Sequence, residues 1–157
     1  MERCWVNRLC YHLKIFMKEK HIQDRLQQIY EKIPAFPSCK HCHQCCGPIL
    51  WFQPEEENIR NYLKKHHLSY QMWTLEEFML HNMQCPYLSK NGCSIYPARP
   101  LICRLQGVIE DLPCRQNIQP ALLKEQWMQI KNEFEDLLFQ CSKKLVWYST
   151  RNYLGSP

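Results

Sequence analysis

Cysteine is the residue type that most constrains what this chain can fold into. Eleven of its 157 residues are cysteine, well above ordinary intracellular usage. A content this high indicates either a framework of disulfides or a set of metal ligands. In the first case covalent bonds hold the cysteine-rich segments together, and in the second case bound metal does.

The N-terminal residues favour metal ligation. A secretory signal peptide needs an uninterrupted apolar run of roughly 7–15 residues, and polar or charged residues break every such run between Met1 and Lys20. No segment reaches the ~18 apolar residues of a membrane span. We therefore expect a cytoplasmic protein with no membrane partner, whose thiols stay reduced. The odd number of cysteines also fits poorly with a fully paired disulfide set.

Apolar periodicity predicts a mainly α-helical fold. Apolar residues recur at three- and four-residue steps over residues 8–32 and from Pro120 to about Tyr148, which is the spacing of an amphipathic helix. A further helix is expected from Pro54 to His67, since proline suits a first turn and acidic residues follow it. A short one is expected at Thr74–Met79, where Thr74 and Glu77 form a capping box.

These elements are expected to form one small domain over residues 1–157, since the length suits a single domain and no linker divides the chain. Strand signals are weak, with Gly107–Glu110 as a candidate short strand. The expected architecture is about four helices around cysteine-rich, metal-stapled loops at residues 34–50 and 82–119. It comprises an N-terminal helix within residues 1–33, a metal-binding core over 39–115 and a C-terminal helix over 120–148.

The first cysteine cluster contains two fused C-x2-C steps and a fourth, adjacent cysteine. A C-x2-C pair closes a tight turn that directs two sulfurs at one centre. Adjacent cysteines tend to point in different directions, so one of the last two could serve a second metal or another edge of a cluster. Gly47 then allows backbone conformations closed to other residues. The predicted ligands are Cys39, Cys42, Cys45 and Cys46.

A second set of cysteines lies between residues 85 and 114 with wider gaps. Turn-forming pairs precede two of them, Asn91-Gly92 before the second and Arg99-Pro100 before the third. The predicted ligands are Cys85, Cys93, Cys103 and Cys114. Together the two sets offer eight ligands, which suits two tetrahedral zinc sites or one iron–sulfur cluster with cysteines to spare.

Both metals remain open on spacing alone. Bacterial ferredoxin loops read C-x2-C-x2-C-x3-C-P, and the first cluster reproduces the first three ligands, whereas the Cys-Pro pair at Cys85 lies far downstream. Zn²⁺ bound by four thiolates accounts for the same residues. The cofactor is therefore expected to be an iron–sulfur cluster or Zn²⁺, with iron–sulfur slightly favoured.

Read in order, these residues resemble the putative zinc- or iron-chelating domain family named for its C-x2-C-x2-C-C motif. The resemblance covers roughly residues 39–115. It rests on the first cluster, then Cys85-Pro, then Cys93-x-Ile-Tyr96, Arg99-Pro and Cys103-Arg. It implies the seven cysteines from Cys39 to Cys103 as chelating residues, with Cys114 as a further member.

The cysteine pattern is also similar to that of flagellin lysine methylases, which are linked to an iron–sulfur centre. This resemblance implies an iron–sulfur-dependent enzyme as an alternative function. The chain departs from such enzymes because it has four glycines and no G-x-G-x-x-G loop. No catalytic residue can be named from the sequence, so whether the protein is an enzyme stays open.

Basic residues near the cysteines have a predicted role. A zinc ion bound by four thiolates carries a net charge of about −2, and Lys40, Arg99, Arg104 and Arg115 stand next to predicted ligands. Arg99 and Arg104 are expected to donate hydrogen bonds to metal-bound sulfur. Cys141 falls on the apolar stripe of the last helix and is expected in the core, and Cys4 and Cys10 lie outside the pattern.

The sequence therefore predicts a metal-binding protein in metal handling, electron transfer or sensing. Its partner is a metal ion or cluster, and any protein partner is unknown. A zinc-ribbon-like nucleic-acid-binding module is a further alternative, supported by the C-x2-C units and a net charge of +5. Thiolate ligands would offset most of that charge, and no Lys/Arg-rich helix face stands out, so nucleic acid is not the expected partner.

Overall fold

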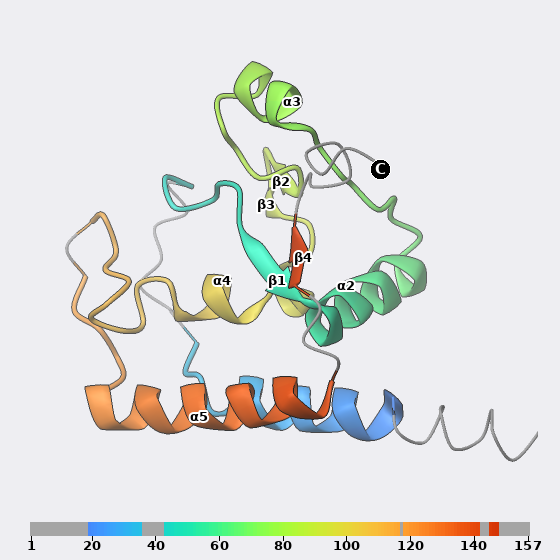
Figure 1. Cartoon of the computed structure of the whole chain (residues 1–157). Coiled ribbons are helices and arrows are strands. Elements are labelled where there is room, and N and C mark those ends of the chain that lie inside the picture. The colour runs from blue at the N-terminus through green and yellow to red at the C-terminus, as the bar shows by residue number, and fades with distance from the viewer. Residues whose placement is uncertain (1–18, 36–42, 117, 142–144, 148–157) are drawn as a thin grey trace, which may run out of the picture.

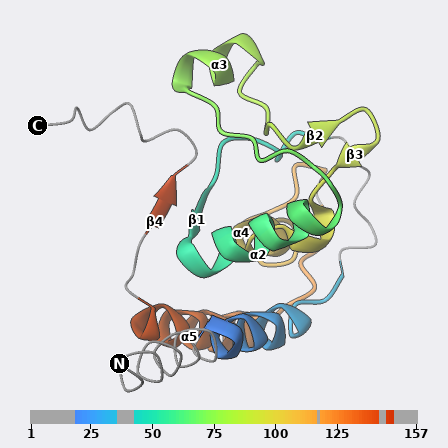
Figure 2. The same ribbon diagram turned by 90° about the vertical axis from the view of Figure 1, so that its right-hand side faces the viewer.

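Two helices lie side by side along one end of the molecule (Figures 1 and 2). The computed structural model describes residues 19–35, 43–116, 118–141 and 145–147. Within these residues the first helix runs over 19–31 and the second, α5, is Lys124–Gln140. Strands form only two two-stranded sheets there, which confirms the mainly α-helical fold.

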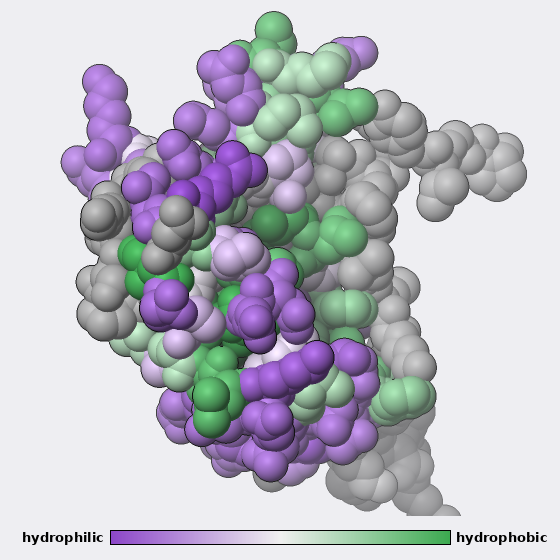
Figure 3. All heavy atoms as spheres, turned by 90° about the vertical axis from the view of Figure 1, so that its left-hand side faces the viewer, coloured by the Kyte–Doolittle hydropathy of each residue, from purple (hydrophilic) through white to green (hydrophobic). Residues whose placement is uncertain are grey.

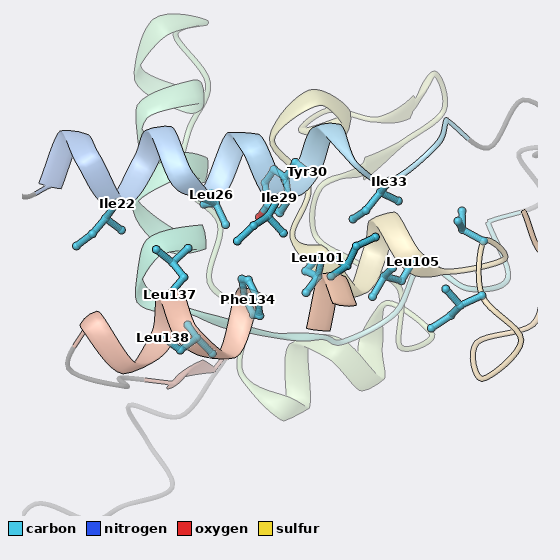
Figure 4. Packing of buried hydrophobic residues seen from close by; sticks show 13 residues of the cluster. Ile22, Leu26, Ile29, Tyr30, Ile33, Leu101, Leu105, Phe134, Leu137 and Leu138 are labelled. Atoms are coloured by element: carbon cyan, nitrogen blue, oxygen red, sulfur yellow. The ribbon is translucent and has the colours of Figure 1, made fainter. Parts of the chain in front are cut away.

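The paired helices enclose the larger of two hydrophobic clusters, here called the helical core. Leu26 and Leu137 are both fully buried where the helices face each other (Figure 4). An ion pair between Lys32 and Glu133 joins their exposed sides. Thirteen buried residues form this core, namely Ile22, Leu26, Ile29, Tyr30, Ile33, Leu101, Leu105, Val108, Ile109, Ile130, Phe134, Leu137 and Leu138.

A second layer of shorter elements holds the cysteines. Strand β1 (Leu50–Phe52) leads into α2 (Gln53–Lys65), and α3 (Leu75–Leu80) projects at the end of the molecule opposite α5 (Figure 1). A hairpin of β2 (Leu88–Ser89) and β3 (Gly92–Cys93) precedes a 3-10 helix, η1 (Tyr96–Ala98). Its hydrophobic cluster, the cysteine-side core, comprises Trp51, Ile59, Leu63, Phe78, Tyr87, Ile95 and Ala98.

A buried carboxylate joins the two layers. Glu55 is only 2% exposed, and its Oε1 accepts hydrogen bonds from Tyr30 Oη at 3.1 Å and Leu101 N at 2.6 Å. Its Oε2 accepts from Phe52 N at 2.9 Å. Leu101 begins α4 (Leu101–Leu105), so Glu55 caps that short helix with a negative charge at its positive end. Three segments, the first helix, β1 and α4, therefore meet at one side chain.

Several expected helix signals are confirmed. Thr74 and Glu77 exchange the two hydrogen bonds of a capping box, from Glu77 N to Thr74 Oγ1 at 3.2 Å and from Thr74 N to Glu77 Oε2 at 2.7 Å. Pro54 lies in the first turn of α2. None of the helices in the described part of the chain has both the length and the apolar character needed to cross a lipid bilayer.

The expected helix over residues 120–148 is too long at both ends. α5 begins at Lys124 and ends at Gln140, because Cys141 takes an extended backbone conformation (φ −92°, ψ 154°). Residues beyond it form β4 (Leu145–Trp147), which pairs antiparallel with β1 and places Trp51 opposite Val146. A β-branched and an aromatic residue favour a strand once a partner strand is available, and that partner lies nearly a hundred residues away.

The region from Leu101 to Glu110 was also predicted wrongly. The expected loop contains the helix α4, and the candidate strand at Gly107–Glu110 is a series of turns. Gly107 has a φ of +78°, and Val108 N donates to Leu105 O at 2.9 Å. Val108 and Ile109 therefore turn back into the helical core, where both are buried.

Candidate metal centre

The described part of the first cluster is a tight turn. Cys46 N donates to His43 O at 3.0 Å, and His43 has a φ of 58°, in the left-handed region that a non-glycine residue rarely adopts. Cys45 is exposed and Cys46 is partly buried. His43 therefore shapes the backbone that presents these two adjacent sulfurs. Cys39, Cys42 and His41 lie outside the described residues.

A backbone contact brings the two cysteine sets together. Cys85 N donates to Cys46 O at 3.1 Å. Beside this bond, a Cβ atom added to Gly47 would stand 3.3 Å from Met83 O, tighter than an ordinary contact. Glycine is thus explained by close approach of two backbones at this position. From the sequence, the expected reason for a glycine at position 47 was its conformational freedom. The reason that the structure gives is close packing against the backbone of Met83.

Turns and one short helix present the other cysteines. Leu88 N donates to Cys85 O at 2.9 Å, which closes a turn directly after Cys85. Cys93 ends the two-residue strand β3, where Gly92 has a φ of +101°, so the predicted Asn91-Gly92 turn is confirmed. Cys103 lies on the helix α4 rather than on a loop, and the carboxylate of Glu55 fixes the start of that helix.

Cys45 and Cys46 form a hydrogen-bonded pair of thiol groups. The hydrogen bond from Cys46 is the largest cause that lowers the pKa of Cys45 to about 6, and the charges of Arg115 and Arg99 act in the same direction. The same bond, together with burial, raises the pKa of Cys46. One sulfur of the pair is therefore a thiolate at neutral pH, and the thiolate is the form that binds metal.

The partly buried sulfurs form a single electrostatic neighbourhood. Burial raises the pKa of Cys103 most, and the nearby sulfurs of Cys85 and Cys93 raise it further. Cys103 and Cys85 in turn raise the pKa of Cys46. Sulfurs that repel one another's negative charge in this way favour a bound cation among them. The described members of this group, here called the sulfur cluster, are Cys45, Cys46, Cys85, Cys93 and Cys103.

Arg99 is the cation that faces the sulfur cluster. Its positive charge lowers the pKa of Cys45, Cys93 and Cys103. The guanidinium stacks 3.8 Å from the ring centroid of Tyr96. Its Nε is buried and has no hydrogen-bond partner within the described residues. A buried N–H without a partner costs about 1–3 kcal/mol. An acceptor among the nearby sulfurs would remove this cost.

Arg104 has a different role. Its Nε donates to Arg99 O at 2.9 Å, and another nitrogen donates to Pro97 O at 2.5 Å. The guanidinium lies 4.0 Å from the ring centroid of Tyr30. These contacts hold the segment before α4 against the first helix. Arg104 thus positions the backbone that carries Arg99. Burial lowers the pKa of its guanidinium, and the nearby Cys103 acts in the opposite direction. The predicted hydrogen bond of Arg104 to metal-bound sulfur stays a prediction.

Two further cysteines and one histidine lie outside the sulfur cluster. Cys114 is partly buried on the segment that follows α4 and stays a predicted ligand. Cys141 packs against the helical core, as its place in the apolar stripe predicts. His81 stacks on Trp73, with ring centroids 4.3 Å apart. No disulfide joins any two of the described cysteines.

The residues present suit a thiophilic metal. Zinc and iron–sulfur clusters are both bound by cysteine thiolates, and the sulfur cluster provides five such groups with a compensating arginine. Among the described residues no three histidine, cysteine or acidic side chains stand close enough together to hold an ion without rearrangement. Two of the predicted ligands, Cys39 and Cys42, lie outside those residues.

Sequence reasoning missed one residue that shapes the site. Glu55 was interpreted only as an acidic residue in the first turn of a helix, which is one of its roles. Its burial and its bond to Leu101, 46 residues away, have no local signature, so only the folded chain reveals that it supports the helix bearing Cys103.

Comparison with known proteins gives one kind of match, and it covers the cysteine-rich region of the chain. Neither the curated proteins nor the solved structures yield a significant match. A family model does match, over a region that begins just before Cys39 and extends into α5. More than half of the chain lies within it. The chain thus belongs to the CxxCxxCC family, described as a putative zinc- or iron-chelating domain, through residues 38–136.

Proposed function

We propose that this chain binds an iron–sulfur cluster through its cysteines and serves in electron transfer or sensing. The family description supports metal chelation but leaves zinc and iron open. The observation that carries the choice is the number of sulfurs in one neighbourhood. Cys45, Cys85 and Cys103 raise the pKa of Cys46, and, in addition to burial, Cys85 and Cys93 raise the pKa of Cys103.

One neighbourhood of this size favours a centre with several metal atoms. A structural zinc ion takes four ligands and is closed, so two zinc ions would need either two separate groups of sulfurs or thiolates that bridge both ions. The described sulfurs overlap, since Cys103 responds to the second-set cysteines Cys85 and Cys93 and also acts on Cys46 of the first set. A cluster bridged by inorganic sulfide accommodates such ligands because they can bind different iron atoms.

Arg99 would then adjust the properties of the centre. Its unpaired Nε and its charge beside three of the sulfurs suit a donor to cluster-bound thiolate. Hydrogen bonds and positive charge near the sulfurs stabilise the reduced, more negative cluster and raise its reduction potential. A cluster held in this way would transfer one electron at a time, or would report on oxidants through its loss.

The test is metal analysis of protein purified without oxygen. We expect iron and acid-labile sulfide in similar amounts, with broad visible absorption that bleaches on reduction. Cys103→Ser should lose the absorption, whereas Cys141→Ser should keep it, because Cys141 packs against the helical core. A colourless protein that carries zinc would overturn the iron–sulfur assignment, and a folded protein without metal would overturn the proposed function.

Arg99→Met gives a second readout in the same preparation. The variant should retain iron but show a lower reduction potential in a redox titration, since it removes a donor and a charge beside the sulfurs. Lys90→Met is a matched control that removes one charge from the β2–β3 turn. An equal shift in both variants would mean that only the overall charge matters and that Arg99 has no special contact with the centre.

A further inference from the structure

A cavity of about 710 Å³ opens beside the sulfur cluster. This volume is within the range of roughly 300–1,000 Å³ that is usual for pockets that hold small molecules. Hydrophobic side chains gather between the α3 end of the molecule and the hydrophilic surface of α5 in Figure 3. The walls come from five places: the segment from Pro48 to Phe52, the start of α2, α3 and the turn after it, α4, and α5.

The cavity shares its walls with the segments that carry the cysteines. Pro48, Ile49 and Leu50 follow directly after Cys46 and Gly47, and Met83 lies two residues before Cys85. Leu101, Ile102 and Leu105 line the cavity from α4, which bears Cys103. None of the cysteines within the described residues lines it. The cavity and the sulfur cluster are therefore neighbouring sites that share supporting segments.

Few charged groups line the cavity, and each interacts with another group of the protein. Glu55 is buried, and its two oxygens accept hydrogen bonds from Tyr30, Leu101 and Phe52. Lys131 and Glu135 form an ion pair at 3.7 Å, with both side chains about half exposed, at 42% and 52%. These three are the charged groups of the lining. The remaining walls are hydrocarbon and aromatic rings, including the indole of Trp127, whose Nε1 is fixed by Asp111 at 3.0 Å.

This chemistry discriminates between classes of occupant. An extended peptide would bring one N–H and one C=O per residue into the cavity, and each would need a partner or cost several kcal/mol, about 2–7 by transfer measurements. Glu55 is the charged group in the buried part of the lining, and its two oxygens already accept three hydrogen bonds. The donors and acceptors that Lys131 and Glu135 retain belong to half-exposed side chains. A hydrocarbon chain has no such groups, and burial stabilises it by about 0.8 kcal/mol per CH₂.

We propose that this cavity binds the hydrocarbon chain of a small amphiphile. The chain lies between Phe78, Leu101 and Phe134, and the head group remains at the rim beside Lys131 and Glu135. Since those two side chains neutralise each other, the site selects for the length of the chain and not for the charge of the head group. This binding site does not depend on the identity of the metal and goes beyond the proposed function.

The test is calorimetric titration of the purified, metal-loaded chain with sodium decanoate and with decyltrimethylammonium, both below the concentrations at which they form micelles. We expect both to bind at one site with similar affinity, and chains of four carbons to bind far more weakly. Leu75→Trp should weaken binding about tenfold or more, a loss of about 1.4 kcal/mol, because Leu75 lines the cavity at 39% exposure.

Leu68→Trp is the matched control, since Leu68 is similarly exposed at 42% and does not line the cavity. It should bind decanoate as the unaltered chain does. Circular dichroism and metal content must be the same in both variants, so that a loss of binding in Leu75→Trp reports on the cavity and not on folding. Equal loss in the two variants would overturn the proposal.

A second measurement locates the bound chain. A bromine-labelled decanoate quenches nearby tryptophan fluorescence on contact, and Trp127 lines the cavity. Quenching should disappear in Trp127→Phe and persist in Trp73→Phe, because Trp73 packs against the cysteine-side core. Binding to neither amphiphile, or quenching that survives in Trp127→Phe, would show that the cavity is not the site. Either result is independent of whether the metal is iron or zinc.

Discussion

The helical core and the cysteine-side core use different means to hold the chain. Thirteen buried residues form the first and seven the second. The helical core is drawn mainly from α4 and two helices of several turns. The cysteine-side layer also has one such helix, α2, but its cysteine-bearing parts are mostly two-residue strands, a three-residue 3-10 helix and turns. Short elements of that kind have few hydrogen bonds of their own and depend on tertiary support.

Backbone strain follows the same division. His43, His67, Asn82 and Met83 all have positive φ angles, and all belong to the cysteine-side layer. A non-glycine residue in that region costs about 1–3 kcal/mol, and the helical core has no such residue within the described part of the chain. We therefore expect bound metal to contribute more to the stability of the cysteine-side layer than to that of the helical core.

Loss of the metal should destabilise the cysteine-side layer much more than the helical core, and this is the largest effect we expect. A structural zinc site contributes on the order of 10 kcal/mol of apparent binding free energy. Cys103→Ser should therefore remove metal and greatly accelerate amide hydrogen exchange in residues 43–98. Residues 19–31 and α5 should keep their protection. Exchange measured by mass spectrometry checks this. Equal acceleration in both regions would mean that the halves do not differ in this way.

A cavity in the helical core should have the converse effect. Leu137→Ala removes a fully buried side chain and should lower the free energy of unfolding by about 2–5 kcal/mol. The variant should keep its metal, because four of the five sulfurs of the cluster lie in the other layer and Cys103 is on α4, whose start Glu55 holds. Denaturant unfolding together with metal analysis measures both. Phe139→Ala, at a 69% exposed position on the same helix, should change stability by less than about 0.5 kcal/mol.

Glu55 tests the connection between the halves. Glu55→Gln should cost about 1–3 kcal/mol, since an amide group cannot accept all three hydrogen bonds of the carboxylate. Burial raises the pKa of Glu55 above its ordinary value. The folded state therefore holds the proton of Glu55 more tightly than the unfolded state does. The stability that this provides is complete below the pKa of an unfolded glutamate, about 4.3, and is lost as pH rises through the raised folded value.

The other carboxylates titrate in both the unaltered chain and Glu55→Gln. The difference between their unfolding free energies therefore reports on the titration of Glu55 alone. The advantage of glutamate should shrink as pH rises from about 4.3 through the raised pKa. An advantage that grows with pH in this window would contradict the raised pKa.

The smallest effect we expect is on reactivity and not on stability. In metal-free, reduced protein, alkylation of Cys45 should increase with pH around a pKa of about 6. Cys46→Ala removes the hydrogen bond that lowers this pKa, so the increase should move to higher pH. Mass spectrometry of peptides labelled at several pH values checks both. An unchanged profile in Cys46→Ala would assign the low pKa to the nearby arginines instead.

Local signals carried the sequence predictions that the structure confirms. The apolar stripe of α5, the capping box at Thr74 and the turn at Asn91-Gly92 each depend on residues a few positions apart. The ligand set named from cysteine spacing stays a prediction, although five of its members now form one electrostatic neighbourhood. For these five cysteines, the residue type and the local turns could be read from the sequence. Their closeness in space became known only from the fold.

The features that the sequence could not reveal all depend on distant partners. β4 becomes a strand because β1 pairs with it, and Glu55 is buried because Tyr30 and Leu101 supply donors from both sides. The cavity is likewise assembled from five segments, none of which is unusual by itself. Such features have no periodicity and no motif, because the chemistry that produces them is spread over the whole chain.

The helix α4 has a thermodynamic consequence for the molecule. It has five residues, too few to hold a conformation alone, and it presents Cys103 to the sulfurs while Ile102 faces the cavity. Any occupant that prefers one position of this helix must change the affinity for metal, and by reciprocity the metal changes the affinity for that occupant by the same factor. If the centre and the cavity are both occupied as proposed, these five residues would link metal content to cavity occupancy.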